Sequence, residues 1–286
     1  MNTYMKMPSF AIAPWMKKRW IRWERHIELT KRQQFILITF FLTLILMLTQ
    51  LISLEYIRYP LVVLLAAITY IGSAFGLRED LRGVEWLTLL IPLTLYSAAV
   101  ALFYFLLPAR WLTRIPVVFL YAIGLYGYLL TQNIYNVAAN RTIALLRAAR
   151  SVGFLLTIIT YYLLVLTILS FRSYPIVNSF WIGSISWLHI FPALWSVELT
   201  EKASGRVVSI SISLAVILAQ LAWAFSMWPM PTTMIALLLS SVLYSTVGMG
   251  QEYLAQKLYK KTIIEFVSVC VIVFLAALLT TRWRGI

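Results

Sequence analysis

The chain has 286 residues, of which 62% are hydrophobic and 12% are charged. Soluble domains have about 45–50% apolar and about 25% charged residues, so the composition excludes an ordinary soluble domain as well as disordered and disulfide-rich classes. Twenty-four Lys and Arg against ten Asp and Glu give a net charge of +14. In a membrane protein such an excess flanks the cytoplasmic ends of the spans, so we do not expect nucleic acid as a partner.

Residues 1–32 are predicted to form a cytoplasmic, basic and aromatic segment ahead of the first span. A helix over residues 11–29 would place an apolar stripe on one face and basic side chains on the remainder. The stripe and the basic residues are Met16, Trp20, Trp23, Ile27 and Lys17, Lys18, Arg22, Arg25. This pattern is typical of an amphipathic helix that lies on an anionic inner leaflet. A docking surface for a partner protein is the alternative.

Nine apolar runs are long enough to cross a bilayer core about 30 Å thick, which needs about 20 helical residues. The predicted spans are Gln33–Leu54, Pro60–Leu77, Glu85–Leu107, Ile115–Val137, Ser151–Phe171, Asn178–Leu199, Val207–Trp228, Pro231–Gln251 and Ile263–Thr281. We therefore predict an all-α polytopic transmembrane bundle over residues 33–281, followed by a short tail over residues 282–286.

The sixth run, Asn178–Leu199, is the weakest span because it contains His189, Pro192 and three Trp residues. Trp prefers the headgroup level, and three along one helix cannot all reach it if the helix spans. If this run were interfacial or re-entrant, the bundle would have eight spans and a cytoplasmic C-terminus.

The basic residues predict the orientation. With the N-terminus inside, eighteen Lys and Arg fall on the cytoplasmic side and six on the opposite side. Because Lys and Arg are retained in cytoplasmic loops, this asymmetry predicts a cytoplasmic N-terminus.

Asn and Arg gather at the inner end of the fourth span and in the loop that follows it. With the neighbouring inner loop they form a candidate contact site for an anionic lipid headgroup or a phosphate. Its members are Arg78, Arg82, Asn133, Asn136, Asn140, Arg141, Arg147 and Arg150. Arg offers paired donors for such groups. Ordinary cytoplasmic charge and helix–helix hydrogen bonds are the alternative.

The segment from Arg78 to Glu85 mixes three acids with two bases. Oppositely charged residues one turn apart stabilise a helical turn. We expect a solvated ion-pair turn between the second and third spans.

His189 and Gln220 are candidates for a polar site within the membrane, where polar side chains are costly and often functional. A neutral His that hydrogen-bonds within the protein is the alternative. A single His without further ligands is not a metal site. We therefore expect no metal, no cofactor and no catalytic residues.

Two loop segments carry a resemblance. They read GLREDLRGVEW over residues 76–86 and NRTIALLRAARSVG over residues 140–153. These segments resemble parts of uncharacterised multi-pass membrane proteins of bacteria. The resemblance implies an inner-membrane protein of unknown role and transfers no site residues.

Three classes of function remain. The first is a non-enzymatic binding, assembly or scaffold component of a membrane complex, and we favour it because the span interiors are uncharged and the chain is rich in aromatic residues. The alternatives are a transporter or channel for an uncharged or lipid-like substrate, and a lipid-binding or lipid-modifying protein that uses the Arg and Asn cluster. The expected partners are the bilayer, anionic lipids and another membrane protein.

Overall fold

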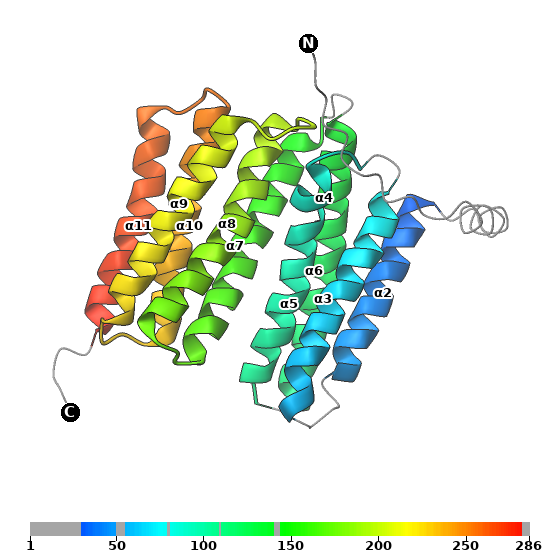
Figure 1. Cartoon of the computed structure of the whole chain (residues 1–286), viewed down its shortest axis with the longest axis horizontal. Helices are drawn as coiled ribbons and strands as arrows, with labels where there is room; N and C mark the ends of the chain where they lie inside the picture. The colour runs from blue at the N-terminus through cyan, green and yellow to red at the C-terminus, as the bar shows by residue number, and fades with distance from the viewer. Residues whose placement is uncertain (1–29, 50–54, 79–80, 109, 140–143, 282–286) are drawn as a thin grey trace, which may run out of the picture.

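In the computed structural model, residues 30–49, 55–78, 81–108, 110–139 and 144–281 are described, and they are helical apart from short connections. The helices (Figure 1) are α2 (Lys31–Thr49), α3 (Glu55–Leu77), α4 (Glu85–Thr88), α5 (Leu90–Leu106), α6 (Trp111–Ala138), α7 (Leu146–Ser170), α8 (Pro175–Glu198), α9 (Gly205–Ser226), α10 (Thr232–Leu254) and α11 (Lys260–Thr280). The predicted amphipathic segment lies outside the described residues, except for its last three positions.

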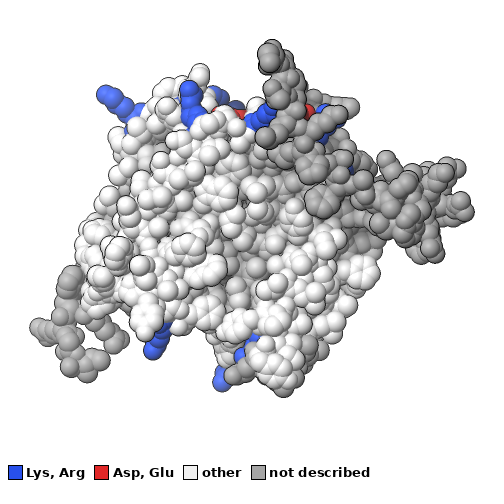
Figure 2. All heavy atoms as spheres, viewed as in Figure 1, with Lys and Arg blue, Asp and Glu red and all other residues white. Residues whose placement is uncertain are grey.

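Within the described ranges, nine helical stretches are long and apolar enough to cross a membrane, with α4 and α5 together forming one of them. Figure 2 shows Lys and Arg at the two ends of the bundle and an uncharged belt between them. The prediction of an all-helical bundle with nine apolar, span-length helices is thus confirmed.

Local sequence explains where several helices begin. At the start of α2, the Gln33 side chain accepts from the Thr30 backbone N–H (2.9 Å), and the Thr30 hydroxyl accepts from the Gln33 N–H (3.4 Å). This reciprocal pair is a capping box. The predicted second span began at Pro60, but α3 begins five residues earlier at Glu55. Pro60 is therefore the sixth residue of α3 and removes one intrahelical hydrogen bond, which helices in membranes tolerate because neighbouring groups satisfy the freed carbonyl.

The sixth span is a continuous helix, α8, despite its Pro and Trp content. Its three Trp residues have different surroundings: Trp181 is exposed, Trp187 is half-buried and Trp195 is buried. The Trp195 indole N–H donates to the Thr200 carbonyl (2.9 Å). Trp195 is therefore a packed residue that closes the end of α8, and it does not need the headgroup region.

The third span is interrupted between α4 and α5 at Leu89. Pro92 follows three residues later and cannot donate to the carbonyl of Thr88, four residues before it. The break therefore has a local chemical cause.

Two hydrophobic cores divide the bundle into an N-terminal half-bundle (α2–α6) and a C-terminal half-bundle (α7–α11). The first core centres on the packed rings of Tyr96, Tyr121 and Tyr128. Residues of α7–α11 supply most of the second core. The half-bundles lie side by side (Figure 1) and meet where α5 and α6 pack against α7 and where α4 packs against α8.

Gly124 of α6 permits a close helix contact, which gives a direct test of the packing. A Cβ at Gly124 would collide with the hydroxyl of buried Tyr96, which donates to the Leu120 carbonyl (3.2 Å). Gly127, one turn away, has no atom within 4 Å of its ideal Cβ position. We predict that Gly124→Ala lowers the free energy of unfolding by about 1–3 kcal/mol through overpacking. Gly127→Ala should leave it unchanged or raise it, and equal thermal midpoints in detergent would contradict this packing.

Candidate functional site

A small cavity lies at the junction of the two half-bundles. Its volume is about 20 Å³, and its walls come from α4, α5 and α6 on one side and from α7, α8 and α10 on the other. Its polar lining consists of Thr88, Tyr128, Gln132, Tyr135, Thr157, Ser196 and Gln251. We call it the interhelical cavity. Because one water molecule needs about 10–15 Å³ of such space, the cavity can hold one.

Several hydroxyl groups around the interhelical cavity already donate their protons to protein atoms. Thr157 Oγ1 donates to the Gly153 carbonyl (2.8 Å), and Ser196 Oγ donates to the Ala193 carbonyl (2.7 Å). Tyr128 Oη lies 3.1 Å from Thr157 Oγ1, and it donates there because the Thr157 proton is committed. These groups can offer only lone pairs to the cavity.

Two amides complete the lining. Gln251 Nε2 donates to the Ala193 carbonyl (2.9 Å) and so ties α10 to α8. Gln132 is 3% exposed, and its Oε1 accepts no hydrogen bond from the described part of the chain. The cavity is therefore rich in acceptors, which suits a water molecule because it can donate two protons.

Arg150 binds the carbonyl end of α8. Its Nε donates to the Ser196 carbonyl (3.2 Å) and its Nη2 to the Val197 carbonyl (3.1 Å). Both carbonyls belong to the last turn of α8, where no intrahelical donor is available and the helix dipole favours a cation. Arg147 lies one turn away on the same helix and is exposed.

The predicted Asn residues are also used in different ways. Asn136 is buried, and its Nδ2 donates to the carbonyl of Leu77, the last residue of α3 (3.0 Å). The Oδ1 of Asn133 is buried and accepts no hydrogen bond from the described residues. Asn140 and Arg141 lie outside them.

The loop after α3 contacts the loop after α8. Arg82 Nη1 lies 3.5 Å from Glu201 Oε1, and the Val84 N–H donates to the Glu201 carbonyl (3.3 Å). Gly83 between them has φ +49°, a left-handed conformation that glycine adopts without a steric penalty. This contact joins the two half-bundles at their basic end.

The expected solvated ion-pair turn between Arg78 and Glu85 needs correction. Glu85 is buried, and its carboxylate accepts from the Arg82 backbone N–H (2.7 Å) at the start of α4. The Arg78 guanidinium stacks over the Phe75 ring (4.5 Å). Arg78, Arg82 and Arg150 of the predicted headgroup site thus each contact a protein group, and their role toward a headgroup stays a prediction.

The structure does not bring His189 and Gln220 together. His189 is buried, its Nδ1 lies 2.8 Å from the Ile185 carbonyl, and its ring packs edge-on against Tyr161. Gln220 is exposed on the outer face of α9. Within the described ranges, no group of three or more His, Cys, Asp or Glu side chains could hold a metal ion.

A groove of about 740 Å³ runs along the outside of the bundle between α8 and α9. At its floor the helices touch closely: Ser179 Oγ donates to the Ala219 carbonyl (2.6 Å), and a Cβ on Gly183 would come within 2.8 Å of the Ala219 Cβ. Trp187 and Trp223 line its walls. We call it the α8–α9 groove.

Sequence analysis did not predict the role of Gln251 or the α8–α9 groove. Gln251 marked only the end of a predicted span, and its partner Ala193 lies 58 residues away. Pro92 and Pro192 both line the interhelical cavity, so proline within a predicted span was the sequence feature that could have pointed to this cavity.

The cap at the end of α8 predicts different effects for two neighbouring arginines. Arg150→Met removes the donors to two terminal carbonyls, and we expect it to lower the free energy of unfolding by about 1–3 kcal/mol. Arg147→Met, on the exposed side of the same helix, should leave the thermal midpoint in detergent unchanged. A larger drop in the thermal midpoint for Arg147→Met than for Arg150→Met would contradict the assigned cap.

Comparison with known proteins identifies one matching family. The model of a family described as "Protein of unknown function (DUF5656)" matches residues 146–280. This match begins at the first residue of α7 and ends at the last residue of α11, so it coincides with the C-terminal half-bundle. No curated protein and no solved structure matches the chain. The chain is similar over this half to an uncharacterised family, as the loop resemblance implied.

Proposed function

We propose that the protein is a non-enzymatic assembly component of the membrane, which docks a transmembrane helix of another subunit in the α8–α9 groove. The groove carries the proposal because it lies on the outer surface of two span-length helices. It faces the bilayer, so a transmembrane partner reaches it by lateral diffusion.

The composition of the groove suits a helix. Gly183 and Ala219 pack against each other at its floor and leave the space above them open, and the indoles of Trp187 and Trp223 provide broad apolar walls. Transmembrane helices associate through small residues and van der Waals packing, because lipid tails provide no hydrophobic driving force between them.

The interior of the bundle gives less support to the two alternative functions, transport and chemistry on a lipid headgroup. Pockets for organic ligands measure about 300–1,000 Å³, whereas the interhelical cavity measures about 20 Å³. Arg150, which headgroup binding would need, already binds two carbonyls of α8. Docking therefore has more structural support than transport through this cavity or chemistry on a headgroup.

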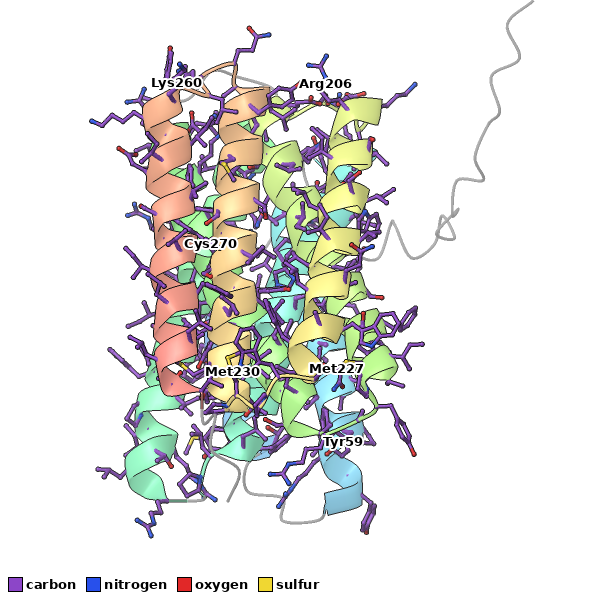
Figure 3. The ribbon with its side chains drawn as sticks, turned by 90° about the vertical axis from the view of Figure 1, so that its left-hand side faces the viewer. Tyr59, Arg206, Met227, Met230, Lys260 and Cys270 are labelled. Atoms are coloured by element: carbon purple, nitrogen blue, oxygen red, sulfur yellow. The ribbon has the colours of Figure 1, made fainter. Side chains whose placement is uncertain are left out.

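The distribution of charge supports a cytoplasmic N-terminus. Among the described residues, eleven Lys and Arg lie at the end of the bundle where α2 begins, and four lie at the other end. Figure 3 shows Arg206 and Lys260 at the first end and Tyr59, Met227 and Met230 at the opposite one. The more basic end is the cytoplasmic one in this proposal.

Labelling at the two ends of α7 tests the orientation. In a Cys270→Ser background, Ala148→Cys and Ser173→Cys each add one exposed thiol near opposite ends of that helix. In right-side-out vesicles, a membrane-impermeant maleimide should label residue 173 and spare residue 148. Inverted vesicles should give the reverse. Labelling of residue 148 from the outside would overturn the orientation.

Photo-cross-linking tests the docking role. A photoreactive residue in place of Ser184, in the groove lining, should form a protein adduct in native membranes. Val216→Trp should reduce that adduct at least severalfold, because the larger side chain occupies the groove.

Val271→Trp on α11 is the matched control, since Val216 and Val271 are 50% and 48% exposed. It should leave the yield unchanged. Adducts with lipid alone, or equal yields from Ser184 and from a photoreactive residue at position 271, would refute docking at this groove.

A further inference from the structure

We propose that two copies of the chain associate through the outer face of α9, with the Gln220 amides of the two copies hydrogen-bonded to each other. This inference rests on the proposed docking role and specifies its partner as a second copy.

Three hydrogen-bonding side chains share the exposed face of α9: Ser209, Ser213 and Gln220. At 100° per residue they fall within an arc of about 40°. Ile212, Val216 and Trp223, which form one wall of the α8–α9 groove, stand beside this stripe on the side toward α8. The polar stripe and the groove therefore belong to one continuous surface.

None of the three side chains hydrogen-bonds to another described residue. Ser211, on the inward face of the same helix, donates to the Val207 carbonyl (2.7 Å). In hydrocarbon no water is available, and an unsatisfied polar group costs several kcal/mol. A serine can meet this requirement through a carbonyl of its own helix, so the need for a partner that lipid tails cannot supply falls on Gln220.

Gln220 lies deep in the membrane, where a polar side chain most requires a hydrogen-bond partner. Gln220 precedes the last residue of α9, Ser226, by six positions, or about 9 Å along the axis. It lies about 22 Å from the first residue, Gly205. The amide is thus inside a hydrocarbon layer about 30 Å thick, away from the headgroups at both ends.

A second copy meets the chemistry of this position. A primary amide is both donor and acceptor, so it pairs with an identical amide. In a two-fold dimer the same patch serves both subunits, and a residue near the axis meets its own copy. An axis beside Gln220 pairs the two amides. The Val216 and Trp223 wall of each copy then faces the side of the partner's α9 that is turned away from α8, so the partner's α9 borders each groove.

Cross-linking of the full chain tests the contact. In the Cys270→Ser background, Ser213→Cys, which lies on the same stripe and keeps Gln220, should form a covalent dimer in membranes with a short bis-maleimide. Ile272→Cys, on the exposed face of α11, should not, although that position is 64% exposed. Equal dimer yields at the two positions would indicate random collision and overturn the proposal.

Association of chains without added cysteines gives an independent measurement. Photobleaching-step counts in vesicles of decreasing protein density yield the dimer dissociation constant, which Gln220→Leu should raise about 3- to 30-fold. Gln220→Asn should keep most of the affinity, because it retains the amide. An unchanged constant for Gln220→Leu, or a monomer at every density, would overturn the dimer.

The mass of the Ser184 adduct separates this inference from the one on which it rests. An adduct of two identical chains supports both. An adduct with a different protein keeps the docking role and overturns the dimer, whereas the absence of any protein adduct overturns both.

Discussion

A bilayer interior contains no water, so each polar group of a spanning helix needs a partner within the protein. Most hydroxyls of this bundle obey this constraint locally. Thr69, Thr160 and Ser240 each donate to the carbonyl four residues earlier. Tyr161 and Ser186 meet across α7 and α8 at 2.9 Å. Against this background, the Oε1 of Gln132 and the amide of Gln220 are two groups without a hydrogen-bond partner among the described residues, and each lies where a molecule from outside the bundle can supply one.

The two positions have different chemistry because they lie in different parts of the bundle. Gln132 faces a cavity that only the contact between half-bundles creates, and the cavity accommodates a water molecule. Gln220 faces outward from the C-terminal half-bundle, the part matched by the uncharacterised family. The groove and the α9 stripe both lie within that matched region. The proposed docking function thus belongs to the family-like half, whereas the N-terminal half-bundle supplies one wall of the interhelical cavity.

Sequence reasoning succeeded where the determining forces are local. Apolar length predicted the nine spans, and their helices differ from the predicted limits by only a few residues at most ends. It failed where a side chain's role depends on a distant helix. Arg150 was predicted only as a headgroup contact, and its bonds to carbonyls 46 and 47 residues away were not foreseen. Glu85 was expected in solvent, but it is buried where the loop after α3 packs on the loop after α8. The Arg150 contact and the burial of Glu85 both depend on residues far away in the sequence, so local spacing could not predict them.

The role proposed for Gln220 is supported by comparison with α11, another helix at the periphery of the bundle. α11 is less covered by the bundle than α9. Of the most apolar part of each helix, 6% is buried in α11 and 28% in α9. The exposed positions of α11 include the apolar Ile264, Ile272 and Leu279, and its exposed hydroxyls, Ser268 and Thr280, donate to carbonyls of their own helix. Glu265 is also exposed, in the second turn from the basic end. Apolar side chains in contact with lipid tails, and hydroxyls bonded to their own helix, need no partner from another protein. α9 has a similar peripheral position and length, yet Gln220, Ser209 and Ser213 on its outer face make no side-chain hydrogen bond to another described residue. Exposure to lipid explains α11, but the outer face of α9 requires a protein partner.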